Sequence, residues 1–124
     1  MHICLESVNL ADRANSVVGD LSGGMQRRLS LAAAIIHQPK LVVLDEPSTG
    51  LDIEARYEVW DLIRSLKQQG VTVLLTTHLL DEVERLCDRI GIIKQGTLLT
   101  EGTIETLRSQ IPAKEIVMID TKDE

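Results

Sequence analysis

Aromatic residues are nearly absent from this chain of 124 residues. It contains no Phe, one Trp and one Tyr, so that aromatic residues make up only 2% of the composition. Its hydrophobic content is nevertheless 44%, which is typical of a sequence that folds. The core must therefore be built from Leu, Ile, Val and Ala, and the chain is long enough for one domain with a sizeable core.

Long apolar runs and an excess of basic residues are missing as well. The longest apolar stretches, Leu29–Ile36 and Val71–Leu75, are each interrupted by a polar residue and are far shorter than the roughly 20 residues that span a bilayer. The first residues lack a basic start and a long apolar run, so we expect no signal peptide. The net charge of −6 and the pI of about 5.0 argue against non-specific binding of nucleic acid.

Cysteine is scarce. Cys4 and Cys87 are the two cysteines of the chain, and their separation does not match the spacing of a metal site. For a protein of the cytosol we expect both as thiols and not as a disulfide.

The order of apolar stretches and turn residues predicts an α/β chain. The four consecutive apolar residues Leu41–Leu44 and the stretch Val71–Thr76 are typical of strands buried on both faces of a parallel sheet. Helices are expected between and around them, which favours a mainly parallel sheet. The expected elements are the end of a helix over 3–10, a polar connection over 11–20, a helix over 24–37, the strand 41–44, a helix over 53–69, the strand 71–76, a short helix after residue 78, a hairpin of 89–94 with 97–101, a helix over 103–110 and a strand over 116–119 before a frayed end.

Several side chains of the predicted helices can be assigned to core or surface. Trp60, the stripe Leu62–Leu66 and the pair Val83 and Leu86 are predicted core. The charged run Asp81–Arg85, which contains three acids and Arg85, is predicted to be a solvated helix face.

Two adjacent carboxylates, Asp45 and Glu46, follow the first predicted strand. In open α/β sheets, ligands bind beyond the carboxyl ends of the strands. Adjacent side chains on a strand point in opposite directions, so the two acids are expected to have different roles. One carboxylate suits Mg²⁺ held partly through water, and the other suits the orientation or deprotonation of an attacking water. The alternative for an isolated Asp-Glu pair is a solvated turn.

A phosphate-binding helix start is predicted at Ser22, Gly23 and Gly24. A helix N-terminus carries about half a positive charge and offers unpaired N–H groups. Gly allows a phosphate to approach the backbone closely, and the Ser hydroxyl adds a donor. The alternative is a simple helix cap.

His78 follows the second predicted strand, at the sheet edge where Asp45 ends the first. A histidine at that edge can donate a hydrogen bond to a γ-phosphate. An isolated His is otherwise more often a packed or a surface residue.

The phosphate-binding loop that usually accompanies such residues is missing. No Gly is followed by Lys in the 124 residues, so the sequence contains no G-x-x-x-x-G-K-[ST] motif.

Four motifs, in this order, carry a resemblance to one family. The chain resembles the carboxyl-terminal half of an ATP-binding cassette (ABC) transporter ATPase over roughly residues 3–110. The matching segments are LSGGMQRR at 21–28 (signature motif), LVVLDEP at 41–47 (Walker B strand), STGLD at 48–52 (D-loop) and Thr77-His78 (switch histidine). The signature and the stretch Asn9–Ala14 resemble the subgroup that serves drug, lipid or polysaccharide exporters.

The resemblance implies a set of roles around the Walker B strand. Asp45 would support Mg²⁺, and Glu46 would polarise the hydrolytic water. His78 would contact the γ-phosphate of ATP.

The resemblance implies further roles across a dimer interface. Ser22, Gly23 and Gly24 would bind the γ-phosphate of ATP held by the opposite subunit, and Gln26 would support the signature end. Asp52 would act near the phosphate loop of the partner. Catalysis in such an arrangement is electrostatic positioning.

The implied fold is an incomplete P-loop NTPase (RecA-like) α/β core with parallel strands, part of the helical signature subdomain and no phosphate-loop strand. We expect a remnant of the helical subdomain over 1–38, half of the core over 39–110 and a C-terminal extension over 111–124. In the family, the missing strand lies between the strand before His78 and the strand Arg89–Lys94. Its absence would leave a gap or force the sheet to close up, and unpaired strand edges invite pairing with another chain.

The resemblance implies a partial ATP-binding subunit of an ABC transporter, with ATP and Mg²⁺ as cofactors and with membrane transporter subunits as partners. We expect it in the cytoplasm, peripheral at the inner face of the membrane. Without the phosphate loop we expect no appreciable ATP hydrolysis by this chain alone. The alternative is a non-enzymatic truncated module that self-associates, as a homo-oligomer or swapped dimer, through exposed sheet edges. A chromosome or DNA-repair ATPase head would require long heptad segments, which the sequence lacks.

Overall fold

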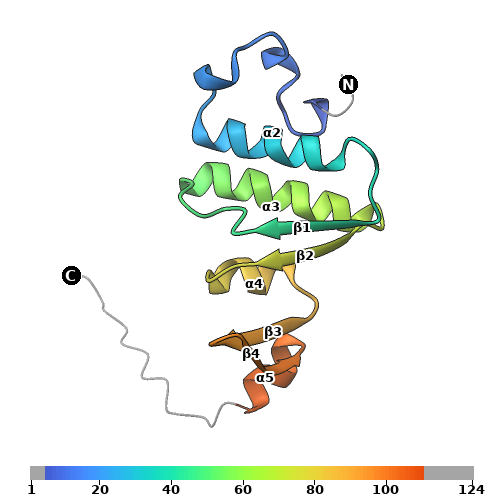
Figure 1. The fold of residues 1–124 in the computed structure, drawn as a ribbon, viewed down its shortest axis with the longest axis vertical. Coiled ribbons are helices and arrows are strands. Elements are labelled where there is room, and N and C mark those ends of the chain that lie inside the picture. The colour runs from blue at the N-terminus through green and yellow to red at the C-terminus, as the bar shows by residue number, and fades with distance from the viewer. Residues whose placement is uncertain (1–4, 111–124) are drawn as a thin grey trace, which may run out of the picture. The chain divides into compact units, whose positions relative to one another are not determined.

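The computed structural model describes residues 5–110, which form two compact units that meet in sequence between Leu86 and Cys87. The predicted strand over 116–119, the frayed end and Cys4 lie outside the described residues. The elements of the first unit are two 3₁₀ helices (Ala11–Arg13 and Val18–Asp20), α2 (Gly23–Ile35), β1 (Leu41–Asp45), α3 (Ile53–Gln68), β2 (Thr72–Thr76) and α4 (Leu80–Leu86), and those of the second unit are β3 (Ile90–Lys94), β4 (Thr97–Gly102) and α5 (Ile104–Gln110) (Figure 1).

The helices of the first unit begin where the sequence places capping residues. The Ser22 hydroxyl accepts from the Met25 N–H at the start of α2, and an Asp52 carboxylate oxygen accepts from the Ala55 N–H, at 2.8 Å, at the start of α3. Gly70 follows α3 with a φ of +82°, a left-handed conformation that favours glycine. Ser22 and Asp52 therefore cap the N-termini of α2 and α3.

The first sheet is a parallel pair of β1 and β2 in which Leu41 lies opposite Thr72 and Asp45 lies opposite Thr76. Val42 and Leu44 of β1 are buried on one face. Together with them, the core contains the apolar stripe of α3, namely Val59, Trp60, Leu62, Ile63 and Leu66. The parallel pair and the alternation of strands and helices confirm the α/β class.

The prediction that both strands are buried on both faces is wrong for this chain. Leu41 and Val43 of β1 are 54% and 61% exposed, and Leu74 of β2 is 56% exposed. These residues alternate with buried or half-buried ones, so within residues 5–110 only one face of the sheet is covered. A continuous apolar run shows that a strand suits burial on both faces, but it cannot supply the second covering layer.

The charged run in α4 is not uniformly solvated, because Glu82 is fully buried with 0% exposure. The prediction of a solvated face is therefore wrong at this residue. Helix α4 packs on α3, where the guanidinium of Arg85 lies 5.5 Å from the ring centroids of Tyr57 and Trp60. Trp60 and Leu86 are buried as predicted, and Val83 is half-buried.

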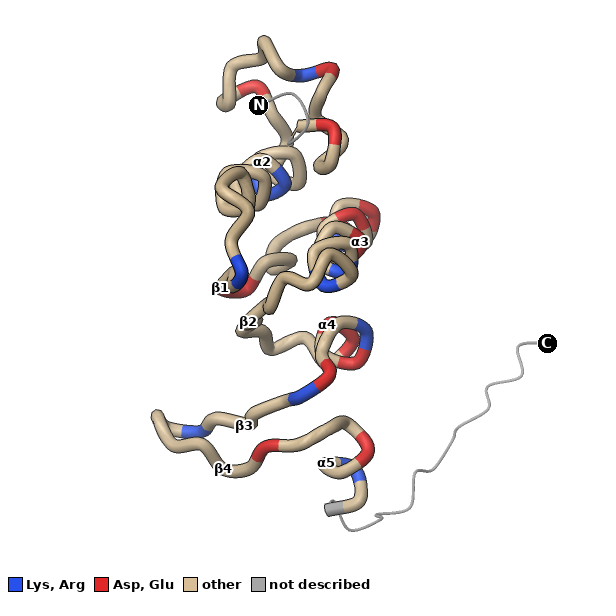
Figure 2. Tube along the Cα trace, turned by 90° about the vertical axis from the view of Figure 1, so that its right-hand side faces the viewer, with Lys and Arg blue, Asp and Glu red and all other residues tan. Residues whose placement is uncertain are grey.

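Acidic and basic residues are interspersed along α3 and α4 (Figure 2). In α3, Asp61 pairs with Arg64 one turn later, an exposed contact that adds a few tenths of a kcal/mol (about 0.3) to a helix. No helix in the described part of the chain is long and apolar enough to cross a membrane.

The second unit is a hairpin followed by a helix. Strands β3 and β4 are antiparallel, and both turn residues, Gln95 and Gly96, have a positive φ, which is typical of a type I′ hairpin turn. The Thr103 hydroxyl accepts from the Thr106 N–H and caps α5. The predicted hairpin and final helix are confirmed. The predicted segments 1–38, 39–110 and 111–124 remain a prediction.

Candidate functional site

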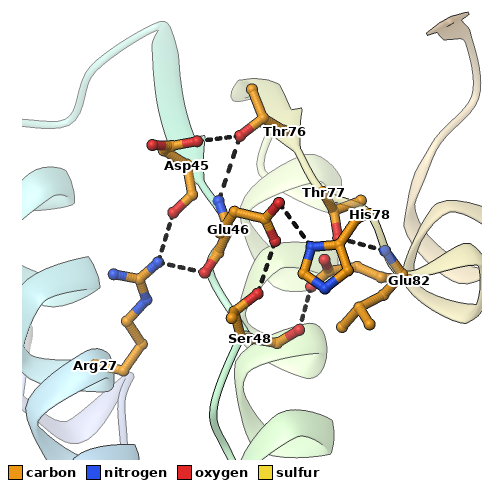
Figure 3. Close-up of polar contacts among 10 residues, drawn as sticks. Arg27, Asp45, Glu46, Ser48, Thr76, Thr77, His78 and Glu82 are labelled. Carbon is orange, nitrogen blue, oxygen red and sulfur yellow. Dashed lines mark hydrogen bonds and ion pairs between the residues drawn. The ribbon is translucent and has the colours of Figure 1, made fainter.

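The carboxyl ends of β1 and β2 bring Asp45 and Thr76 together. The two residues are partners in the parallel register, and the Thr76 hydroxyl donates to Oδ1 of Asp45 (Figure 3). The next backbone N–H, that of Glu46, donates to the Thr76 carbonyl at 3.0 Å. Residues 31 positions apart are thereby joined at the edge where open α/β sheets bind ligands.

Glu46 leaves the strand in an uncommon backbone conformation. Its φ is +47°, in the left-handed region, which costs a non-glycine residue about 1–2 kcal/mol. Its carboxylate lies against His78, with 2.9 Å between Oε1 and Nδ1, and its Oε2 accepts from the Thr49 hydroxyl at 2.7 Å. The long-range and local contacts around the loop offset this strain and fix the direction of the carboxylate.

Hydrogen bonds from His78 and, next in importance, from Thr49 hold the pKa of the Glu46 carboxyl below its ordinary value of 4.5. Glu46 is therefore ionised throughout the neutral range. Because an ionised carboxylate only accepts hydrogen bonds, Nδ1 of His78 carries the hydrogen in this contact. The His78 side chain is 65% exposed, so its ring can also meet a ligand from solvent.

Arg27 holds this loop from the side of α2. Its guanidinium donates to the backbone carbonyls of Asp45, Glu46 and Pro47, each at 2.7 Å (Figure 3 shows the contacts with Asp45 and Glu46). A planar guanidinium has five N–H donors in a fixed arrangement, which suits several acceptors on neighbouring residues. The sequence did not identify Arg27 as a site residue, because no pattern of side chains reports a bond to backbone carbonyls.

The two glycines at the start of α2 differ in how much space surrounds them. A Cβ placed on Gly23 would meet nothing within 4 Å, whereas a Cβ on Gly24 would lie 2.7 Å from the Cβ of Ala55. Gly24 therefore allows α2 to pack closely on α3, and Gly23 leaves backbone accessible at the positive end of the helix.

The other two predicted site residues support helix ends. The Gln26 amide donates to the carbonyls of Leu21 at 3.0 Å and Val18 at 3.3 Å, which fixes the segment just before α2. Asp52 uses one carboxylate oxygen to cap α3, close to the point where Gly24 packs against Ala55.

The predicted site residues thus form two groups. One group lies at the ends of the strands and consists of Asp45, Glu46 and His78; the other lies at the starts of α2 and α3 and consists of Ser22, Gly23, Gly24, Gln26 and Asp52. Arg27 connects them, since it belongs to α2 and binds the loop that carries Asp45 and Glu46.

The donor set has the chemistry of a partial Mg²⁺ site. Among the described residues no group of three His, Cys, Asp or Glu side chains could enclose a metal ion. Mg²⁺ in phosphate-transfer sites uses one or two carboxylates and takes its other ligands from phosphates and water. Asp45, with one carboxylate oxygen held by Thr76, fits that requirement.

Comparisons with known proteins found a family model and curated relatives that match most of the first unit. A family model described as "AAA domain, putative AbiEii toxin, Type IV TA system" matches residues 9–84. The curated protein "Nod factor export ATP-binding protein I" of Rhizobium leguminosarum bv. viciae is 53% identical over 98 residues, which are 79% of this chain and 32% of that protein. Its namesake from Burkholderia orbicola (strain AU 1054) is 50% identical over 103 residues, which are 83% of this chain and 34% of that protein.

Solved structures agree as well. The ADP conformation of MJ1267, an ATP-binding cassette of an ABC transporter, has a TM-score of 0.78 and 28% identity, over 85% of this chain and 41% of the other. A nucleotide-free ATP-binding cassette from an ABC transporter has a TM-score of 0.80 and 27% identity, over 86% and 43% of the two chains. The chain belongs to the AAA-domain family of this model, and its fold is that of part of an ABC ATP-binding cassette.

This ABC-type chain corresponds to part of the ATPase domain. It spans about a third of the length of the curated relatives it matches, and about two fifths of the matched solved cassettes. The matched range 9–84 contains every residue of both groups of the candidate site. The predicted family and the predicted P-loop NTPase fold with a partial sheet are confirmed.

Proposed function

We propose that this chain provides part of the ATP-binding subunit of an ABC exporter. The observation that carries the proposal is the Glu46–His78 pair, held at 2.9 Å beside Asp45 at the carboxyl end of the parallel strands. ATP binding and hydrolysis that drive transport are the activity of such subunits, and the relatives named for Nod factor export favour an exporter.

In this proposal Asp45 holds Mg²⁺ together with the phosphates of ATP. When bound there, Mg²⁺ would supply neutralisation of charge on the phosphates. Glu46 orients the hydrolytic water through lone pairs that its contacts with His78 and Thr49 leave available. Because its pKa is lowered, Glu46 is suited to orienting that water and is a weak base in the resting site. His78 contacts the γ-phosphate with its exposed ring.

The start of α2 serves a second nucleotide in the same proposal. Ser22, Gly23 and Gly24 face the γ-phosphate of ATP on an opposite subunit, with Gly23 supplying open backbone and Gly24 keeping α2 close to α3. Gln26 holds the chain just before the helix, and Asp52 acts across the interface. The partners are a second ATPase subunit and membrane transporter subunits, which places the chain at the cytoplasmic face of a membrane.

Since the 124 residues contain no G-x-x-x-x-G-K-[ST] motif, the proposal requires a phosphate loop from elsewhere before Asp45 and Glu46 can act. The test is calorimetric titration of the 124-residue chain with MgATP. We expect affinity weaker than about 1 mM, which corresponds to about −4 kcal/mol. Binding tighter than this that Asp45→Asn abolishes would mean that the chain holds nucleotide by itself.

A second candidate function is self-association without catalysis. Val43 and Leu74 are partners in the β1–β2 register and expose 61% and 56% of their surface on the same face of the sheet, with Leu41 beside them. An uncovered apolar sheet face and unpaired strand edges favour pairing with a second copy. Light scattering over a range of concentrations distinguishes the candidates, because a monomer at high concentration contradicts self-association.

A further inference from the structure

Glu82 is the one fully buried carboxylate among the described residues. It lies in α4 with 0% exposure, and carboxylates are almost never fully buried unless they are paired. Its Oε1 accepts two hydrogen bonds, from the Ser48 hydroxyl at 2.7 Å and from Nε1 of Trp60 at 2.8 Å (Figure 3 shows the contact with Ser48). One oxygen atom thereby joins three separate segments of the first unit.

The second carboxylate oxygen of Glu82, Oε2, makes burial of this side chain unfavourable in free energy. Oε2 is buried and has no hydrogen-bond partner among residues 5–110. A buried group without a partner costs about 1–3 kcal/mol, and an apolar residue of similar size would avoid that cost. Stability alone therefore does not account for a carboxylate at this position.

The segments that Glu82 joins are those that carry the candidate catalytic pair. Ser48 follows Glu46 by two residues in the loop after β1, and α4 starts at Leu80, two residues after His78. The Ser48–Glu82 bond thus connects the loop of Glu46 to the helix that follows His78. Trp60 connects the same carboxylate to α3, and Arg85 strengthens the contact of α4 with α3 through its position over the Trp60 ring.

We propose that Glu82 is a positioning residue that sets the placement of His78 against Glu46. Its hydrogen bond with Ser48 fixes the position of α4 relative to the loop after β1. Because α4 begins just after His78, this position keeps Nδ1 of His78 at hydrogen-bond distance from the Glu46 carboxylate. The importance of this alignment for catalysis depends on the function proposed above. The alignment itself is a property of the chain without nucleotide and can be tested without it.

The test follows the ring nitrogens of His78 by ¹⁵N NMR in the 124-residue chain, at a pH where the imidazole is neutral. In the unaltered chain we expect the Nδ1–H tautomer, because Glu46 accepts from that nitrogen. Glu82→Ala and Ser48→Ala should both lose the predominance of this tautomer. Glu82→Gln should retain it, since its amide oxygen can accept from both Ser48 and Trp60.

Two controls separate positioning from a general loss of structure. Glu84→Ala removes an exposed carboxylate of the same helix and should leave the His78 spectrum unchanged. Trp60 is the single tryptophan of the chain, so its fluorescence reports on the buried end of the contact. In Ser48→Ala the Trp60 fluorescence should stay as in the unaltered chain while the His78 spectrum changes.

An unchanged His78 spectrum in folded Ser48→Ala overturns the proposal, as does a changed spectrum in Glu84→Ala. If Glu82→Ala does not fold, Ser48→Ala and Glu82→Gln still decide the question. Neither readout involves ATP, so a failure of the nucleotide titration and a failure of this test are distinguishable.

Discussion

The two groups of the candidate site are built in different ways. Around Glu46, side chains from three parts of the chain hold one another: Thr76 binds Asp45, His78 and Thr49 bind Glu46, and Arg27 binds the backbone between them. At the start of α2, the site is mostly backbone, with Gly23 facing open space and Ser22 serving as a local cap. The first group is ordered by long-range side-chain contacts, whereas in the second Ser22 and Gln26 bond within their own segment and Gly24 alone depends on packing against α3.

This difference bears on how far each group depends on residues outside the 124-residue chain. Under the proposed function, the start of α2 needs no further residue of this chain to meet a phosphate, because Gly23 leaves its backbone open. Under the same proposal, Asp45, Glu46 and His78 act only on phosphates that a phosphate loop holds. Under the proposed function, these 124 residues would therefore contribute to a nucleotide site on another subunit more readily than they would form a complete site by themselves.

The largest effect on stability is expected for substitutions of the two glycines of α2. They test whether a side chain at residue 23 meets open space while one at residue 24 collides with α3. Gly24→Ala should destabilise the chain by about 2 kcal/mol, because its Cβ would collide with that of Ala55. Gly23→Ala is the matched control and should change stability by no more than about 0.5 kcal/mol.

Thermal or denaturant unfolding measures both variants. Ala55→Gly combined with Gly24→Ala should restore part of the lost stability, since it removes the colliding methyl group. Equal effects at Gly23 and Gly24 would show that close packing of α2 on α3 does not distinguish them.

A smaller effect is expected at Arg27, the residue that joins the two groups. Arg27→Ala should cost about 1–2 kcal/mol, because three carbonyls lose a charged donor but remain partly accessible to water. Arg27→Lys should recover less than half of this, since an ammonium cannot match the guanidinium geometry. Amide hydrogen exchange of the loop should rise in both variants, and unchanged exchange would mean that Arg27 does not hold the loop.

The smallest effect concerns the titration of Glu46. Its folded pKa is lowered, so its contribution to stability is fully present above the ordinary value of 4.5 and is lost as the pH falls through the lower folded pKa. In carboxyl NMR titrations, His78→Ala should raise the Glu46 pKa most and Thr49→Val less.

Glu105 provides the control for that titration. Its pKa is lowered by hydrogen bonds with its own backbone N–H and with Thr103, so it should not respond to changes at His78 or Thr49. A Glu46 pKa that does not move in His78→Ala would contradict the contact described above.

Features that depend on a few neighbouring residues could be predicted from the sequence. The caps Ser22 and Asp52 and the turn at Gln95-Gly96 follow from local backbone chemistry. The meeting of Asp45 with the segment before His78 followed from the rule that parallel strands end at the same edge.

Features that depend on tertiary packing could not be predicted. Glu82 has the sequence context of a solvated acid, and only the approach of Ser48 and Trp60 makes it a buried acceptor. The apolar run of β1 resembles that of a doubly covered strand, although Leu41 and Val43 are exposed in the described part of the chain. Arg27 donates to backbone carbonyls, and because every residue has a carbonyl, the sequence does not show which ones Arg27 binds.

The central claim is the proposed function, in which Asp45, Glu46 and His78 act in ATP hydrolysis once a phosphate loop, which the 124 residues lack, is supplied. The most direct test is an ATP hydrolysis assay of the 124-residue chain, alone and mixed with a fragment that carries the G-x-x-x-x-G-K-[ST] loop of an ABC ATPase. We predict no Glu46-dependent turnover by the chain alone, and turnover that Glu46→Gln abolishes once the fragment is present. Turnover by the purified chain alone that Glu46→Gln abolishes would contradict the account.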